Sequence, residues 1–384
     1  MVCPLDAALS LPARCYSDLL REWMTYGSTD AAYRETQTLL ARILGLRLST
    51  QALETAVAED AGDVAAFWTQ PVPARPPTSG ATILVAQADG KGVPMVPPTI
   101  PQPRAGRRGK GQPPGTKQEA IVTSVYTIAP YRRTPADVLA ALLAEPAPAP
   151  RAARPRPLGK EVRATLDGKP AALTRLAARG VQHESARIQQ RVALTDGAVA
   201  LQQQMQAHLP GHTLVLDIIH ATEHLWEVAN AVLGERHPDR TAWVRQRLGW
   251  LLTGRAATLI AELDRVAAAP TLTTAQRKVV QQTVGYYQRN LPSMGYDEYL
   301  AQGWPIGTGV VEGACGHLVK DRLEQAGMRW TKGGAQAVLD LRAVRLNGQW
   351  DAYWHFHRQQ HHARHYGAAP IPARVEDQAF RLAA

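Results

Sequence analysis

The sequence predicts an α/β fold, in which a mixed sheet with flanking helices follows an N-terminal helical domain. The first observation is a set of short runs that are rich in β-branched residues and bounded by turn residues, as buried strands are. The second is helical periodicity over 13–67 and again over 220–300. The third is a length of 384 residues, which is enough for two or three domains. The predicted strands are 81–86, 120–128, 191–197 and 213–220.

Residues 1–68 are predicted to form the helical domain. Apolar residues recur at helical spacing around Leu20 and around Leu40, and Ser49 follows a glycine-containing turn as the N-cap of a further helix. Helix, turn and helix in this order are the outline of a DNA-binding helix-turn-helix, and equally of a small helical docking or dimerisation domain. A stiff proline-rich linker, 69–80, follows.

The first two predicted strands are long enough to pair with each other. The first ends at Asp89, which precedes a glycine and therefore also fits a hairpin turn. Between the two strands, 97–117 reads as a basic loop that could lie along phosphates. A helix is predicted over 135–143, the proline-rich tract 145–157 is predicted to have no regular structure, and helical character resumes over 173–189.

The last two predicted strands are joined by a predicted helix at 198–208. A strand, a helix and a strand at this spacing predict a parallel pair with a crossover connection. Asp196 closes the first strand of this pair, and Asp217 lies within the second predicted strand. The helical block that follows, 220–302, is divided by prolines into several helices.

The stretch 303–315 is the one around which the rest of the chain is organised. Its glycines and proline end any helix that arrives from upstream. Thr308 is a suitable N-cap, and apolar residues then recur at the helical period. Glu312 lies in the first turn of this predicted helix, where an acidic residue also suits the helix dipole. A last long helix is predicted over 332–365.

Three acidic residues in these elements suggest metal-dependent chemistry. Asp89, Asp196 and Glu312, if they meet in one cleft, would raise one another's pKa values and favour a divalent cation. Two Mg²⁺ ions about 4 Å apart would then activate water or a 3′-hydroxyl in phosphodiester transfer. Periodicity alone does not select these three among 33 acidic residues, and the local sequence is needed.

That local sequence resembles bacterial insertion-sequence transposases of the ISKra type, which are relatives of the Mutator-like and ISL-type DDE enzymes. The likeness runs from about residue 10 to residue 360. It implies a ribonuclease-H-like catalytic core that is interrupted by an all-helical insertion before the glutamate. The segments that carry it are 85–90, 193–197, 216–220, 303–313 and 327–330.

The resemblance assigns roles to named residues. It implies that Asp89, Asp196 and Glu312 form the catalytic and metal-binding triad, with two Mg²⁺ or Mn²⁺ ions per site. Asp217 and His220 match the family's Cys/Asp-x-x-His signature, which points to a DNA contact for His220. A second assignment takes Asp196 and Asp217 as the first two triad members. Outside catalysis, Asp217 would be a helix N-cap and His220 a core or capping histidine.

The resemblance also implies an activity and its partners. Such an enzyme cuts at the terminal inverted repeats of its element and joins the freed ends to target DNA. Because two DNA ends are processed together, at least a dimer is expected, in the bacterial cytoplasm near the nucleoid. The net charge of +10 and the pI near 9.7 favour a polyanionic partner. The basic residues after Glu312 are candidate phosphate contacts, or a solvated helix face: Lys320, Arg322, Arg329 and Lys332.

The predicted domains follow from this layout. Residues 81–219 are the first part of the core, 220–302 the helical insertion, and 303–384 the glutamate-bearing helix with the C-terminal helices. No run approaches the roughly 20 apolar residues of a membrane span, and no secretory signal is visible. Three widely spaced cysteines fit neither a disulfide framework nor a zinc site and favour a reducing compartment.

Two alternative functions remain open on the sequence. One is a catalytically dead remnant of such an element that still binds DNA. The other is a zinc metallopeptidase, because His220, Glu223 and His224 match the His-x-x-Glu-His pattern, with a distal carboxylate such as Glu235 as third ligand.

Overall fold

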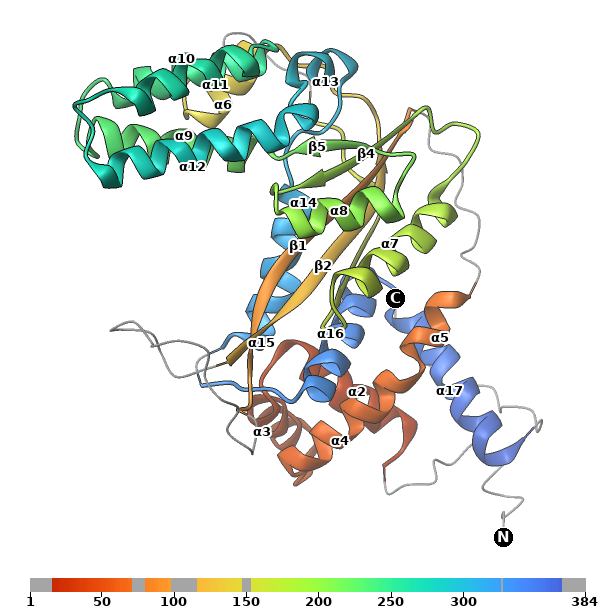
Figure 1. Cartoon of the computed structure of the whole chain (residues 1–384). Helices are drawn as coiled ribbons and strands as arrows, with labels where there is room; N and C mark the ends of the chain where they lie inside the picture. The colour runs from red at the N-terminus through yellow and green to blue at the C-terminus, as the bar shows by residue number, and fades with distance from the viewer. Residues whose placement is uncertain (1–15, 71–79, 98–115, 147–152, 326, 368–384) are drawn as a thin grey trace.

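The computed structural model describes residues 16–70, 80–97, 116–146, 153–325 and 327–367. N-terminal and C-terminal helices lie at one end, the sheet in the middle, and a group of long helices at the other end (Figure 1). Most of the predicted linker, most of the predicted basic loop and part of the predicted proline-rich tract lie outside the described residues.

The sheet has five strands in the order β3-β2-β1-β4-β5. β1 (Ile83–Met95) pairs antiparallel with β2 (Thr116–Ile128), which pairs antiparallel with β3 (Leu158–Thr165). On its other side β1 pairs parallel with β4 (Gln190–Thr195), and β4 with β5 (Thr213–Leu216). This mixed sheet with flanking helices confirms the predicted α/β class, and the parallel pair is as predicted. It is compatible with a ribonuclease-H-like core.

One predicted strand end is wrong, and one strand was not predicted. β1 does not end at Asp89, because that residue pairs with Val122 and the ladder continues to Met95. The long β-branched run opposite therefore overrides the local Asp-Gly turn signal. β3 was not predicted, because Glu161 and Arg163 interrupt its apolar pattern; Glu161 is nevertheless buried, in a paired contact with Arg179.

Helices cover both faces of the sheet (Figure 1). One face packs Leu84 and Ala86 of β1 against α7 and α8. The other face packs Val93 of β1 and Val122 of β2 against the segment that carries Glu312. The covering helices are α7 (Lys169–His183), α8 (Val199–His208), α14 (Gly309–Ala314), the π-helical η3 (Cys315–Lys320), α15 (Asp321–Leu323) and α16 (Lys332–Leu346).

The N-terminal helices pack against the C-terminal ones. Ser49 caps α4 by accepting a hydrogen bond from the Ala52 N–H at 3.0 Å, as predicted. The single helix predicted over 332–365 is wrong, because Gly348, with a φ of +67°, breaks it into α16 and α17. These elements are α2 (Asp18–Asp30), α3 (Tyr33–Leu44), α4 (Thr50–Asp60), α5 (Val64–Thr69) and α17 (Trp350–Tyr366).

A block of helices follows β5 and precedes α14. Pro238 and Pro270 lie between its helices, as predicted. α6 (Pro135–Leu142) joins the block beside α10 (Figure 1) and contributes Val138 to the same apolar core. The block consists of α9 (Ile218–Val232), α10 (Arg240–Leu252), α11 (Ala256–Ala268), α12 (Thr274–Asn290) and α13 (Tyr296–Gln302).

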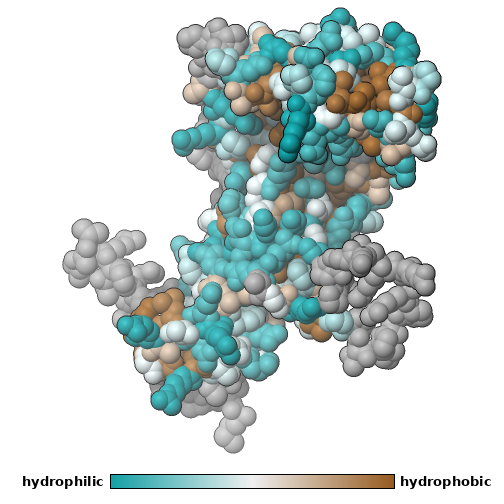
Figure 2. Space-filling view, turned by 90° about the vertical axis from the view of Figure 1, so that its left-hand side faces the viewer, coloured by the Kyte–Doolittle hydropathy of each residue, from teal (hydrophilic) through white to brown (hydrophobic). Residues whose placement is uncertain are grey.

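The surface is polar over the middle of the face drawn in Figure 2, with apolar patches toward both ends. On the N-terminal helices the exposed apolar residues include Leu39 and Ile43 of α3. Within the described ranges, no helix has both the length and the apolar character that crossing a membrane requires.

Arg322 is a packing residue, so its predicted contact with DNA is wrong. Its side chain has no exposed surface. The guanidinium donates to the Ser28 carbonyl at 2.8 Å and lies over the rings of Tyr33 and Trp330. It therefore fastens the end of α2 to the segment that follows Glu312.

Replacing Arg322 with alanine is expected to lower the free energy of unfolding by about 2–4 kcal/mol, because a charged hydrogen bond and a large buried side chain are both lost. Urea unfolding measures the change. Lys320→Ala, an exposed neighbour, is the matched control and should stay within about 0.5 kcal/mol of the parent chain. Equal stability of the two variants would contradict the packing role.

A second buried charged network joins α17 to the N-terminal helices. His357 Nδ1 lies 2.7 Å from Asp63, and its Nε2 lies 3.3 Å from Asp60. Arg364 makes two contacts to the Asp63 carboxylate at 2.7 and 2.8 Å. Burial lowers the pKa of His357, but the hydrogen bonds and charges of Asp60 and Asp63 outweigh it and raise the pKa above its ordinary value.

The stabilisation that His357 provides is therefore expected to depend on pH. Its folded-state pKa lies above the unfolded value of about 6.5, so the contribution is complete below that pH and is lost as the pH rises through the folded-state pKa. The difference in unfolding free energy between the parent chain and His357→Gln should become smaller as the pH rises from about 6 to about 9. His355→Gln, an exposed control on the same helix, should show no such trend.

Candidate metal and catalytic site

The register of three parallel strands brings three aspartates to one edge of the sheet. The last paired positions are Gln87 with Leu194 and Thr195 with Leu216. Asp89 follows Gln87 by two residues, and Asp196 follows Leu194 by two residues, so these two aspartates are level with each other. Asp196 and Asp217 each come directly after the second pair, so they are level as well. Side chains alternate along strands, so all three carboxylates belong to the same face.

Gln87 fixes the Glu312 helix to that face. Its buried Oε1 accepts hydrogen bonds from the Val311 N–H at 3.0 Å and from the Ser124 hydroxyl at 3.2 Å. Its Nε2 donates to the Gly307 carbonyl at 3.4 Å. The first turn of α14 is thereby held against β1, two residues before Asp89. Gln87 was not predicted as a site residue, although a polar residue at the end of an apolar strand indicates a specific buried partner.

Thr308 links two carboxylates. It occupies the predicted N-cap position of α14, but its side chain makes no capping hydrogen bond to the helix backbone. Its hydroxyl instead lies in short hydrogen-bond contact with both Asp217 and Glu312. Burial, together with the nearness of Glu312, raises the pKa of Asp217 to about 6.

Asp217, His220 and Glu312 form a potential metal-binding group. One ligand atom from each lies within 4.8 Å of the others, and no other group of three or more such residues occurs in the described part of the chain. Asp217 also caps α9, accepting from the Ile219 N–H at 2.8 Å. Two carboxylates and an imidazole are a donor set that suits a divalent cation.

Asp89 lies beside this group and not within it. Its carboxylate is contacted by the Cys315 thiol at 3.4 Å, on the turn that follows Glu312. Burial raises the pKa of Asp89; the charge of Asp196 acts in the same direction and that of His220 opposes it. These influences place Asp89, Asp196 and His220 within electrostatic reach of one another.

The backbone around Asp196 is held by the helical block. Tyr286 of α12 donates its hydroxyl to the Asp196 carbonyl at 2.8 Å. Gly197 has a φ of +92°, and a Cβ there would lie 2.8 Å from the Tyr286 ring, so only glycine fits. The Asp196 carboxylate accepts from the Ala198 N–H at 2.9 Å. No local sequence pattern indicates that Tyr286 contacts a residue so far upstream.

The zinc-peptidase pattern does not assemble a ligand set. His220 Nδ1 lies 3.0 Å from Glu223, and His224 Nδ1 lies 3.1 Å from Glu227. Each imidazole thus faces a glutamate on its own helix. The two histidines belong to no shared group of three ligands among the residues that the structure describes.

The remaining basic candidates lie on the surface. Lys320 and Arg329 are exposed, and Lys332 forms an ion pair with Asp167 at 3.1 Å. An exposed ion pair of this kind contributes little to stability, so it does not prevent Lys332 from meeting another anion.

Comparisons with known proteins identify no family. No family model matches the chain, and the comparison with curated proteins finds no match. Among solved structures, the Drosophila P element transposase strand transfer complex is similar over 93% of this chain and 83% of the other, with 8% sequence identity and a TM-score of 0.27. A TM-score of that size does not establish a shared fold, so the site is interpreted from its own residues.

Divalent cation binding should depend on the three grouped residues and on the hydroxyl that links them. Asp217→Asn and Glu312→Gln are each expected to weaken Mn²⁺ binding by about tenfold or more, because a charged ligand is lost. Thr308→Val should weaken it by about tenfold through misorientation of both carboxylates. Isothermal titration calorimetry measures the affinities.

Glu227→Gln is the matched control for these variants. Glu227 is an exposed acidic residue on α9 outside the group, and its replacement should leave Mn²⁺ affinity unchanged. Parent-like affinity in Asp217→Asn would show that the group does not hold the ion.

Proposed function

We propose that this chain is a DNA transposase that cuts the ends of a mobile element and transfers them to target DNA. One observation carries the proposal: strand register sets Asp89, Asp196 and Asp217 side by side, and Gln87 and Thr308 bring Glu312 to the same edge. A concentration of carboxylates at one sheet edge is the arrangement that metal-dependent phosphodiester chemistry requires.

Within this proposal Asp89, Asp196 and Glu312 are the catalytic carboxylates. Bound Mg²⁺ or Mn²⁺, two ions per site, would activate the attacking hydroxyl and stabilise the leaving oxygen. Asp217 and Thr308 orient Glu312. His220, one third exposed, would donate to a scissile phosphate from the start of α9. In the second assignment, Asp217 replaces Asp89 in the triad. The grouping of Asp217 with Glu312 supports this second assignment.

The proposed partner is double-stranded DNA. The net charge of +10 supports a polyanionic partner, and Lys320, Arg329 and Lys332 lie on the exposed surface that follows Glu312. The N-terminal helices are the proposed DNA-reading domain, and the catalytic complex would contain at least two copies of the chain. The proposed family is the ISKra type, with a ribonuclease-H-like core over 81–219 and 303–384 and a helical insertion over 220–302.

The proposal predicts metal-dependent cleavage of a supercoiled plasmid that carries the native element's ends. The parent chain should nick or linearise it in Mg²⁺ or Mn²⁺, whereas Asp89→Asn, Asp196→Asn and Glu312→Gln should each lower the rate by a factor of about 100 or more, because each removes a ligand charge from the reacting centre. Gel electrophoresis measures cleavage, and Glu227→Gln should cut at the parent rate.

The same experiment separates the alternatives. Loss of cleavage in Asp217→Asn with normal cleavage in Asp89→Asn would replace the proposed triad by the second assignment. A parent chain that binds the ends but never cuts would indicate a DNA-binding remnant. DNA binding that does not weaken with salt would contradict the DNA partner itself, since each phosphate contact adds about −0.9 to the log–log slope.

A further inference from the structure

A pocket lies at the β3 edge of the sheet, between α7 on one face and α16 on the other. Ile121 and Thr123 of β2 line it, and they flank Val122, the residue paired with Asp89. Because side chains alternate along a strand, Ile121 and Thr123 face away from the Asp89 carboxylate. Ala164 of β3 and α16 close the pocket from the other face. Its volume is about 490 Å³, within the range of small-molecule sites.

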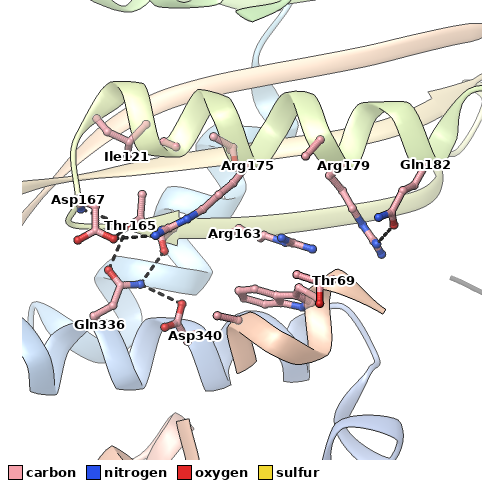
Figure 3. Close-up of a pocket in the computed structure, with 16 residues that line it drawn as sticks. Thr69, Ile121, Arg163, Thr165, Asp167, Arg175, Arg179, Gln182, Gln336 and Asp340 are labelled. Carbon is pink, nitrogen blue, oxygen red and sulfur yellow. Dashed lines mark hydrogen bonds and ion pairs between the residues drawn. The ribbon is translucent and has the colours of Figure 1, made fainter. Parts of the chain in front are cut away.

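Besides β2, the elements α5, β3, α7 and α16 build the walls. Figure 3 shows Arg175 and Arg179 of α7 above, Arg163 of β3 at the centre, and Gln336 and Asp340 of α16 below. α5 closes the pocket with Trp68 and Thr69. The N-terminal helices, the sheet edge and a C-terminal helix therefore meet at one cavity.

Most polar groups of the pocket have partners. Arg175 donates to Thr165 and to Asp167, both at 2.8 Å. Arg179 is paired with Glu161 on the neighbouring strand. Asp340 accepts from the Gln336 amide at 2.9 Å. These pairs leave little unmatched charge.

Arg163 is the exception. Its guanidinium makes no hydrogen bond, and its Nε and Nη2 are buried without a hydrogen-bond partner. The closest carboxylate oxygen, on Glu161, is 4.0 Å away and already serves Arg179. The Arg163 Cζ lies 4.0 Å from the centre of the Trp68 ring, so a cation–π contact holds the guanidinium in place. A buried donor group left without an acceptor is costly, and an anion in the pocket would satisfy it.

The rest of the lining is partly apolar. Ile121 and alanines 164, 172 and 178 give it side chains without hydrogen-bonding groups, beside the hydroxyls of Thr69 and Thr123. Asp340 and Gln336 stand across the pocket from Arg163 (Figure 3). Burial raises the pKa of Asp340 to about 7, so this carboxyl does not impose a full negative charge against an anion near neutral pH.

We propose that this pocket binds a small organic anion with a flat apolar body, its carboxylate or phosphate held by Arg163 and its body packed against the alanine-lined wall. The site is separate from the proposed catalytic edge and does not depend on it. A ligand there would bridge α5, β3, α7 and α16.

Phenyl phosphate and benzoate are the probes, tested by isothermal titration calorimetry on the whole chain. At least one should bind at one per chain, about tenfold or more tighter than inorganic phosphate, which lacks the apolar body. The two probes distinguish a phosphate ligand from a carboxylate ligand. Benzylammonium, the same body with a positive charge, should not bind.

Two variants test the site itself. Arg163→Met removes the cation and should weaken probe binding by about tenfold or more. Ala178→Phe fills the pocket from an exposed position and should also abolish binding, even if Arg163→Met folds poorly. Arg236→Met, an exposed arginine at the far end of the helical block, is the matched control and should bind normally. The proposal is overturned if neither aromatic anion binds at about 10 mM. Unchanged binding in both pocket variants, or tighter binding of benzylammonium, would equally overturn it.

Discussion

The buried side chain of Gln87 is the constraint on which the candidate site depends. Besides Val311, Gly307 and Ser124, its amide contacts the Tyr126 hydroxyl at 3.2 Å. A buried amide that loses such partners costs about 1–3 kcal/mol each. These hydrogen bonds hold the loop before α14 and its first turn against β1, and Glu312 follows Val311 in that turn. A polar residue in the sheet core thus specifies the position of a carboxylate from another part of the chain.

The same edge concentrates charge that opposes folding. Asp217 has no exposed surface and lies in contact with Glu312 through Thr308, and Asp89 feels the charge of Asp196. Like charges this close destabilise the folded state unless protons, hydrogen-bond donors or cations offset them. The donors that offset them include the Ile219 N–H, the Thr308 hydroxyl and the His220 imidazole. A divalent cation at this edge would offset more of the negative charge, so the arrangement favours metal binding at the expense of stability.

Sequence patterns predicted the elements in which local and tertiary preferences agree. The β4, α8 and β5 unit has strong local signals, and Asp217 is the helix N-cap that its position suggested. The failures occur where a distant partner decides. The Asp-Gly turn signal at Asp89 yields to pairing with β2, and Arg322 is buried by rings from distant segments. For the site, the sequence supplied candidate carboxylates one at a time. No local pattern indicated that Asp217, and not Asp89, would group with His220 and Glu312.

The helical block is part of the site's construction, although it lies far from most of the sheet. Three buried phenols donate to backbone carbonyls at the strand ends and in α9: Tyr286 to Asp196, Tyr296 to Leu216 and, in α9, Tyr287 to Ala221. Each carbonyl belongs to a segment that carries an aspartate or its helix. Without the block these acceptors would need other partners, and the strand ends would lose the contacts that fix their backbone. The helices between Asp217 and Glu312 are therefore part of the site's support. They fix the backbone of the aspartate-bearing segments in the position where Glu312 lies beside them.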